Sequence, residues 1–222
     1  MLVVLFGPDG AGKTTAALLL ASRLRKRGYK TSYLKLKSHH LLAYLILKLL
    51  QAIKRVPRSQ SPRLLDYRLR GLFKGSKMHL AVELLSILLW IAVNVHPRLA
   101  LKRVVVADRY TPDSIASLTL VHGRLSGTAL KVLLAQCRKA AVFYMYADAG
   151  TLLDRKKDEN LSLTYLRYTA RLYERVALTL SALGVNVVRI STSANPKAET
   201  LKTILERIEP QLPARKEAGE IC

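Results

Sequence analysis

Cysteine is nearly absent from this sequence, and so are the segments that join separate domains. The 222 residues include two cysteines, Cys137 and Cys222, which lie far apart in the chain. Such cysteines offer neither a disulfide framework nor the closely spaced ligands of a zinc site, and they fit a reducing compartment. The chain also has no proline- and glycine-rich linker, no internal repeat and no low-complexity tract. It therefore predicts one domain over residues 1–213, with a frayed tail over residues 214–222.

Acidic residues are scarce as well. The chain has 15 aspartates and glutamates against 37 lysines and arginines, and its formal net charge is +22. A field of this sign attracts phosphates, nucleic acid or anionic membranes. The chain has no recognisable nucleic-acid-binding motif, so the charge favours small polyanionic substrates over nucleic acid. The first apolar run, Leu2–Phe6, is too short for a secretory signal peptide, and a cytoplasmic protein is expected.

A glycine-rich segment follows this apolar run and matches the phosphate-binding pattern G-x-x-x-x-G-K-[ST]. Its glycines let several backbone N–H groups point at one anion, and the following helix adds the positive end of its dipole. Lys13 would contact the β- and γ-phosphates, and the Thr14 hydroxyl would bind Mg²⁺. The predicted cofactors are therefore ATP and Mg²⁺. The predicted nucleotide-binding residues are Gly7, Pro8, Asp9, Gly10, Ala11, Gly12, Lys13, Thr14 and Thr15.

A second candidate for metal binding follows the apolar run Val104–Ala107. Asp108 comes directly after these residues, at the carboxyl end of a predicted parallel strand, where such sheets bind their ligands. An aspartate in that position is a natural second partner for a Mg²⁺ ion held at Thr14. The sequence therefore predicts a metal site made by Thr14 and Asp108, and it gives Lys13 and Asp108 catalytic roles.

The remaining pattern concerns the fold. Half of the residues are hydrophobic, which is enough for the core of one α/β domain. Short apolar runs alternate with helical patterns, which predicts a three-layer α/β/α fold around a five-stranded parallel sheet. The predicted strands are Leu2–Phe6, Thr31–Lys37, Val104–Ala107, Ala141–Ala147 and Asn186–Ile190. The predicted helices are Gly12–Arg27, Leu41–Arg55, Arg63–Lys74, His79–His96, Ser126–Arg138, a short one near Thr151, Ser162–Leu183 and Pro196–Ile208. Polar residues interrupt His79–His96, which is interpreted as a buried helix rather than a membrane span.

Taken together, these motifs resemble the thymidylate kinase family of P-loop nucleoside monophosphate kinases over nearly the whole chain. The resemblance rests on the phosphate loop Gly7–Thr15, the triplet Asp108-Arg109-Tyr110 and the basic cluster Arg155-Lys156-Lys157. The segment Tyr173–Ala177 is similar to the family's helix after the lid. The residues from Asp108 to Asp113 also match the pattern Asp-Arg-Tyr-x-x-Asp of thymidylate-kinase-like proteins.

The resemblance implies roles for residues on the acceptor side of the reaction. Asp9 matches the carboxylate that binds the acceptor's 3′-hydroxyl. Arg109, with Tyr110 beside it, matches the arginine that holds the acceptor monophosphate. Family members with glycine at the position of Gly10 supply a catalytic arginine from a helical lid. Here the lid would span about residues 150–162, and Arg155 would be that arginine.

The implied function is Mg-ATP-dependent phosphoryl transfer to a nucleoside monophosphate, with dTMP to dTDP as the leading reaction. In the family, a phenylalanine and an arginine before the Asp-Arg strand recognise thymine, and neither residue type occurs between His79 and Pro97. One alternative is a kinase for a lipid- or glycan-linked phosphate at a membrane surface, which the cationic helix Leu41–Arg55 suggests. Another is a nucleotide-gated nucleic-acid-binding module. A homodimer and peripheral membrane contact are left open.

Overall fold

The computed structural model describes residues 1–36, 77–157 and 162–213. The predicted helices Leu41–Arg55 and Arg63–Lys74 and the tail 214–222 lie outside the described residues. The predicted lid is described in two parts: α8 (Ala149–Asp154) and the turn that continues to Lys157, and Ser162 at its far end.

Five parallel strands form the centre of the molecule, in the order β2-β3-β1-β4-β5. The strands are β1 (Leu2–Phe6), β2 (Thr31–Lys35), β3 (Val104–Asp108), β4 (Ala140–Tyr146) and β5 (Val187–Ser191). All five predicted strands are present, with ends that differ by a residue or two. In the register of the sheet, Asp108 pairs with Leu5 of β1 on one side and with Lys35 of β2 on the other.

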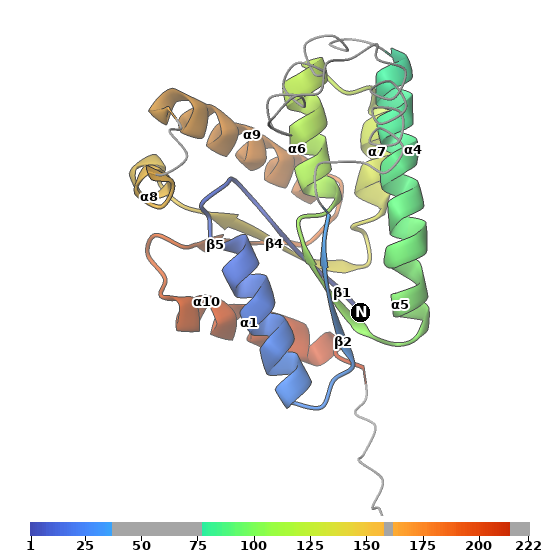
Figure 1. The fold of residues 1–222 in the computed structure, drawn as a ribbon, viewed down its shortest axis with the longest axis vertical. Helices are drawn as coiled ribbons and strands as arrows, with labels where there is room; N and C mark the ends of the chain where they lie inside the picture. The colour runs from blue at the N-terminus through green and yellow to red at the C-terminus, as the bar shows by residue number, and fades with distance from the viewer. Residues whose placement is uncertain (37–76, 158–161, 214–222) are drawn as a thin grey trace, which may run out of the picture.

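Two helices cover one face of the sheet: α1 (Lys13–Lys26) and α10 (Lys197–Ile208). Figure 1 shows them together on one side of the strands. Leu20 and Leu24 of α1 and Ile204 of α10 are fully buried in one apolar cluster with Val3 of β1. The packing of this first layer fixes the position of α1, and with it the position of the loop that precedes α1.

The opposite face carries most of the remaining helices, which Figure 1 shows on the other side of the strands. They are α4 (Lys77–Asn94), α5 (His96–Ala100), α6 (Thr111–His122), α7 (Gly127–Ala135) and α9 (Leu163–Ala182). The short 3-10 helix η2 (Glu209–Gln211) follows α10. The three-layer α/β/α fold with a five-stranded parallel sheet is thereby confirmed.

Helix α6 was not predicted from the sequence. Its first turn, Thr111-Pro112-Asp113, consists of residues typical of turns. In the structure Tyr110 is the N-cap, Pro112 lies in the first turn, and the Asp113 carboxylate accepts a hydrogen bond from the Tyr110 amide. Proline lacks only an N–H that the first turn leaves unused, so these residues begin a helix rather than prevent one. For the same reason Pro97 lies inside α5 instead of ending α4.

The interpretation of α4 as a buried helix is wrong in part. Ile87 and Ile91 are buried against the sheet, but Met78, Leu85 and Val93 are 74%, 58% and 62% exposed. Only one stripe of a helix can face a sheet, and the sequence of α4 has no polar stripe to mark its outer side. Among the described residues, Lys77–Ala100 is long and apolar enough to cross a membrane by length and composition alone, a property that core helices share.

Candidate functional site

The phosphate loop is held in place by backbone geometry that only glycine tolerates. Gly7 has a φ of 147°, and a Cβ atom there would lie 2.0 Å from the Met145 carbonyl oxygen of β4. Gly12, the N-cap of α1, has a φ of 75°, in the left-handed region. Gly7 is therefore required for the chain to pass β4, and Gly12 favours the left-handed turn from the loop into α1. The turn leaves the N-terminus of α1 facing a cavity.

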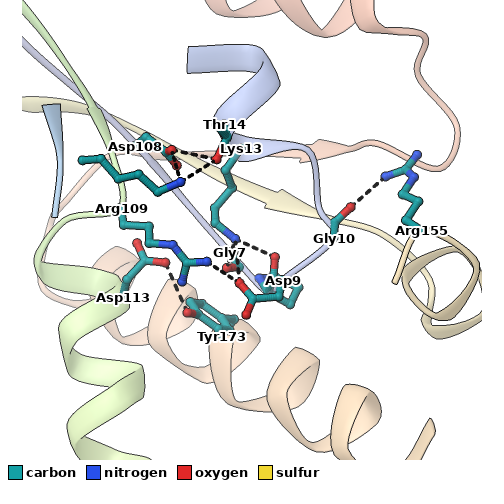
Figure 2. A network of polar contacts seen from close by, with 12 residues as sticks. Gly7, Asp9, Gly10, Lys13, Thr14, Asp108, Arg109, Asp113, Arg155 and Tyr173 are labelled. Atoms are coloured by element: carbon teal, nitrogen blue, oxygen red, sulfur yellow. Dashed lines mark hydrogen bonds and ion pairs between the residues drawn. The ribbon is translucent and has the colours of Figure 1, made fainter. Parts of the chain in front are cut away.

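Lys13, in the first turn of α1, is buried at 4% exposure. Its ammonium donates hydrogen bonds of 2.6 Å to the carbonyl oxygens of Gly7 and Pro8 and lies 3.8 Å from the Asp9 carboxylate. Burial lowers the pKa of Lys13 to about 8, although Asp113 and Asp9 nearby act in the opposite direction. The loop thus holds a buried cation at its centre (Figure 2).

The two predicted metal ligands meet directly. The Thr14 hydroxyl donates a 2.7 Å hydrogen bond to Oδ2 of Asp108, which is fully buried at the end of β3. Two β2 side chains also reach that oxygen: the Tyr33 hydroxyl donates to it at 2.8 Å, and the Lys35 ammonium lies 3.3 Å away. Burial, followed by the bond to Asp108, raises the pKa of Tyr33. The other oxygen, Oδ1, is buried without a hydrogen-bond partner in the described part of the chain.

These observations test whether Mg²⁺ fits the site. A hydroxyl and a carboxylate are oxygen ligands of the kind that Mg²⁺ prefers. Asp108 keeps one oxygen without a donor, and a positive charge, the Lys35 ammonium, already lies 3.3 Å from each predicted ligand. The residues present therefore fit a divalent cation.

Arg109, the predicted acceptor-binding residue, lines another part of the cavity. This residue has a φ of 70°, which is rare for residues other than glycine. Such strained backbone conformations are found most often at functional sites. Its guanidinium forms an ion pair with Asp9 across the phosphate loop. Burial alone would raise the pKa of Asp9, but the charges of Arg109 and Lys13 outweigh it and lower that pKa below its ordinary value. Asp9 and Arg109, predicted separately, thus form one charged pair (Figure 2).

A buried carboxylate, that of Asp113, lies near this pair, and its charge acts on Arg109. Asp113 accepts one hydrogen bond from the Tyr110 amide and another, of 3.2 Å, from the Tyr173 hydroxyl of α9. Burial raises the pKa of Asp113 to about 6, against the opposing charges of Lys13 and Arg109. The side chain of Tyr110, by contrast, is 1% exposed and packs in the apolar core. Tyr110 does not line the cavity, so its side chain has no exposed surface with which to make the predicted contact with substrate.

Arg155 approaches the phosphate loop from the end of α8. Its guanidinium donates to the Gly10 carbonyl at 3.2 Å, and to the Thr192 hydroxyl and carbonyl at 3.1 and 2.8 Å. Figure 2 shows it reaching the loop at Gly10, away from the Asp108 carboxylate. Arg155 thereby ties the phosphate loop to the segment after β5. Its predicted contact with the transferred phosphate would require it to exchange these partners.

One cavity of about 800 Å³ lies among these groups, although the buried Asp108 and Asp113 are not part of its lining. Asp9, Lys13, Thr14, Arg109 and Arg155 all line it, and so does the segment 192–197 between β5 and α10. Sequence reasoning missed that segment. Its position at the carboxyl end of a parallel strand was the available signal, since ligands of open α/β sheets bind at that edge.

Sequence reasoning also missed Tyr33 and Lys35 as neighbours of Asp108. The two residues are separated by one position on β2, so their side chains point to the same side of the strand. The local pattern therefore shows that their side chains lie on the same face of β2. It does not show that β2 lies next to β3, which is what brings them to Asp108.

Comparisons with protein families and with curated proteins find no match. Among solved structures, the chain is similar to the crystal structure of the YorR protein from Bacillus subtilis in complex with phosphorylated GDP. The TM-score is 0.57 and the sequence identity 18%, and the similarity covers 95% of this chain and 97% of that chain. The chain therefore has a fold that is also found in a protein solved with a bound nucleotide.

Proposed function

We propose that this protein is a Mg-ATP-dependent nucleoside monophosphate kinase, with dTMP as its leading acceptor and dTDP as the product. One observation carries the proposal: the Thr14 hydroxyl and the Asp108 carboxylate meet at 2.7 Å beside the phosphate loop. A strand-loop-helix that delivers a lysine and a threonine, beside an aspartate at the end of a neighbouring strand, is the arrangement that P-loop enzymes use for a metal–triphosphate complex.

On the triphosphate side, the loop amides and Lys13 would hold the β- and γ-phosphates. Thr14 and Asp108 would hold Mg²⁺, which when bound neutralises developing charge on the phosphates. Lys13 needs little reorganisation, because its ammonium already lies inside the loop. Arg155 would leave Thr192 and contact the transferred phosphate, as lid residues do when an active site closes.

On the acceptor side, Arg109 would bind the acceptor's phosphate and Asp9 the sugar hydroxyl. The ion pair between them keeps both side chains at the cavity wall. Asp113 and Tyr173 support this arrangement from the buried side. Phosphoryl transfer depends mainly on position and charge. Two protein side chains that hold the acceptor in a fixed position would therefore contribute directly to the rate.

We also propose that the enzyme discriminates only weakly between the bases of its nucleotide acceptors. Helix α4 carries neither arginine nor phenylalanine, so the thymine-reading groups of the resembling family are missing from it. Hydrogen-bonding groups that read a substrate give selectivities of about 10⁴, whereas apolar fit gives roughly 10 to 200. We therefore expect dTMP to lead dUMP by less than about a hundredfold in kcat/KM.

The test is ADP release from MgATP with a panel of acceptors: dTMP, dUMP, dGMP, GMP, CMP and AMP. The proposal is supported if ADP release requires an added monophosphate and if dTMP has the highest kcat/KM, with a modest lead over dUMP. A preference for dTMP of about 10⁴ contradicts the expected weak base reading. Failure of every monophosphate to stimulate ADP release contradicts the kinase assignment for nucleotides.

A second candidate is a kinase for a lipid- or glycan-linked phosphate at a membrane. It is favoured by the exposed apolar side chains of α4, together with the net charge of +22. This candidate gains support if no monophosphate is a substrate and the protein sediments with anionic vesicles at low salt.

A further inference from the structure

The metal ligands Thr14 and Asp108 already share a cation that belongs to the protein. Lys35 is the last residue of β2, and its backbone pairs with Asp108 in the parallel register. Its ammonium lies 3.3 Å from Oδ2 of Asp108 and 3.3 Å from the hydroxyl oxygen of Thr14. The ammonium therefore occupies the place beside both oxygens that a divalent ion would take.

A buried carboxylate needs such a partner. Asp108 is fully buried, and taking an unpaired charge out of water is costly. In the part of the chain that the structure describes, Lys35 supplies the ion pair to Asp108. The remaining donors to that carboxylate, Thr14 and Tyr33, are neutral hydroxyls.

The contact of Lys35 is nevertheless a loose one. Charge-assisted N–H···O bonds are usually about 2.7–2.9 Å long, whereas both Lys35 distances are 3.3 Å. The Lys35 side chain is 35% exposed, while Lys13 is 4% exposed and makes contacts of 2.6 Å. Lys35 can therefore leave toward solvent without disturbing the core, which Lys13 cannot do.

We infer that Lys35 is a resident counter-ion of the Thr14–Asp108 pair, and that a divalent metal has to displace it in order to bind. A metal held by the Thr14 hydroxyl and Oδ2 of Asp108 would lie next to the Lys35 ammonium, which contacts the same two oxygens. Like charges at that separation repel, so the ammonium opposes the metal. Mg²⁺ bound through few protein ligands draws the rest from phosphates and water. The metal accordingly enters with its nucleotide and binds the empty protein poorly. This inference rests on the proposed metal–nucleotide function of the same site.

The test measures Mn²⁺ binding to the full chain without nucleotide, from the electron paramagnetic resonance signal of free Mn²⁺. Lys35→Gln keeps the length of the side chain and removes its charge. Because the lost charge lies next to the metal position, this variant should bind Mn²⁺ at least about tenfold more tightly than the wild type. Lys35→Arg keeps the charge and should retain the weak binding of the wild type.

Two further variants test whether tighter Mn²⁺ binding comes from the loss of the Lys35 charge beside Asp108. Lys30→Gln makes the same change of net charge at an exposed residue that precedes β2, and it should leave the Kd for Mn²⁺ unchanged. Adding Asp108→Asn to Lys35→Gln should abolish the gain. The inference is overturned if Lys35→Gln binds Mn²⁺ like the wild type, or if Lys30→Gln binds it equally tightly. Turnover does not enter these measurements, so they stand whether or not a monophosphate proves to be a substrate.

Discussion

Asp108 and Asp113 are both buried at the junction of β3 and α6, but the fold treats their oxygens differently. In Asp113 each oxygen accepts a hydrogen bond from the protein, one from the Tyr110 amide and one from the Tyr173 hydroxyl. In Asp108 three donors crowd Oδ2, and Oδ1 has no partner among the described residues. Buried polar groups are normally satisfied, and an exception calls for an explanation. The fold bonds both oxygens of Asp113 but only one oxygen of Asp108, among the described residues, which agrees with the metal site that we propose there.

The difference teaches where to expect catalysis and where to expect support. A buried carboxylate whose ion-pair partner is a partly exposed lysine can exchange that lysine for another cation without breaking the fold. A carboxylate with both oxygens bonded, as in Asp113, is expected to hold its partners Tyr110 and Tyr173 and to act on Arg109 and Lys13 through its charge. Three experiments sharpen or break this distinction.

The largest effect is expected from Lys13→Ala, because its ammonium is the buried cation at the centre of the phosphate loop. Loss of its charge should lower kcat by about 2 to 3 orders of magnitude, as is typical for groups that stabilise developing charge. The fold should survive, since burial of the ammonium is itself costly and lowers its pKa to about 8. Steady-state kinetics and thermal unfolding measure the two effects. Lys26→Ala at the exposed end of α1 is the matched control, and near-wild-type turnover of Lys13→Ala would contradict the assignment.

A smaller but more discriminating effect is expected from the matched pair Asp108→Asn and Asp113→Asn. If Asp108 holds the metal as proposed, removing its charge should lower kcat by up to about a hundredfold. Asparagine at 113 can still accept from the Tyr110 amide and can donate to the Tyr173 oxygen, so its kcat should fall less than about tenfold. Initial rates at saturating MgATP and acceptor measure both variants. Equal losses would erase the proposed distinction between the two carboxylates.

The smallest expected effect concerns stability and its dependence on pH. Burial raises the pKa of Asp113 from 3.8 to about 6. Between these values the folded protein keeps a proton that the unfolded chain releases, so this carboxyl lowers stability as pH rises from about 4 to about 6. Asp113→Asn removes the titration. Relative to the wild type, its free energy of unfolding should rise by about 1–3 kcal/mol over that range.

Urea denaturation of both proteins at pH 4 and pH 6.5 measures this difference. Comparing the two proteins cancels the contribution of carboxyl groups with lowered pKa values, such as Asp9. A constant difference between the two pH values would mean that folding does not raise the pKa of Asp113.

The sequence by itself determined the parts of this protein that depend on local spacing. The phosphate loop follows from three glycines, a lysine and a threonine at set intervals after an apolar run, because each needs only its chain neighbours to adopt its backbone form. The five strands follow from short apolar runs between helical patterns. Asp108 follows from its place directly after such a run, since ligands bind at the carboxyl ends of parallel strands.

Tertiary structure alone decided what lies beside these residues. Lys35 and Tyr33 reach Asp108 because β2 is the outer neighbour of β3. Tyr173 reaches Asp113 because α9 packs against α6. The outer side of α4 is exposed because one helix face is enough to cover its part of the sheet. These contacts join residues far apart in the chain, and strand order and helix packing are set by burial of the whole core, which no local pattern contains.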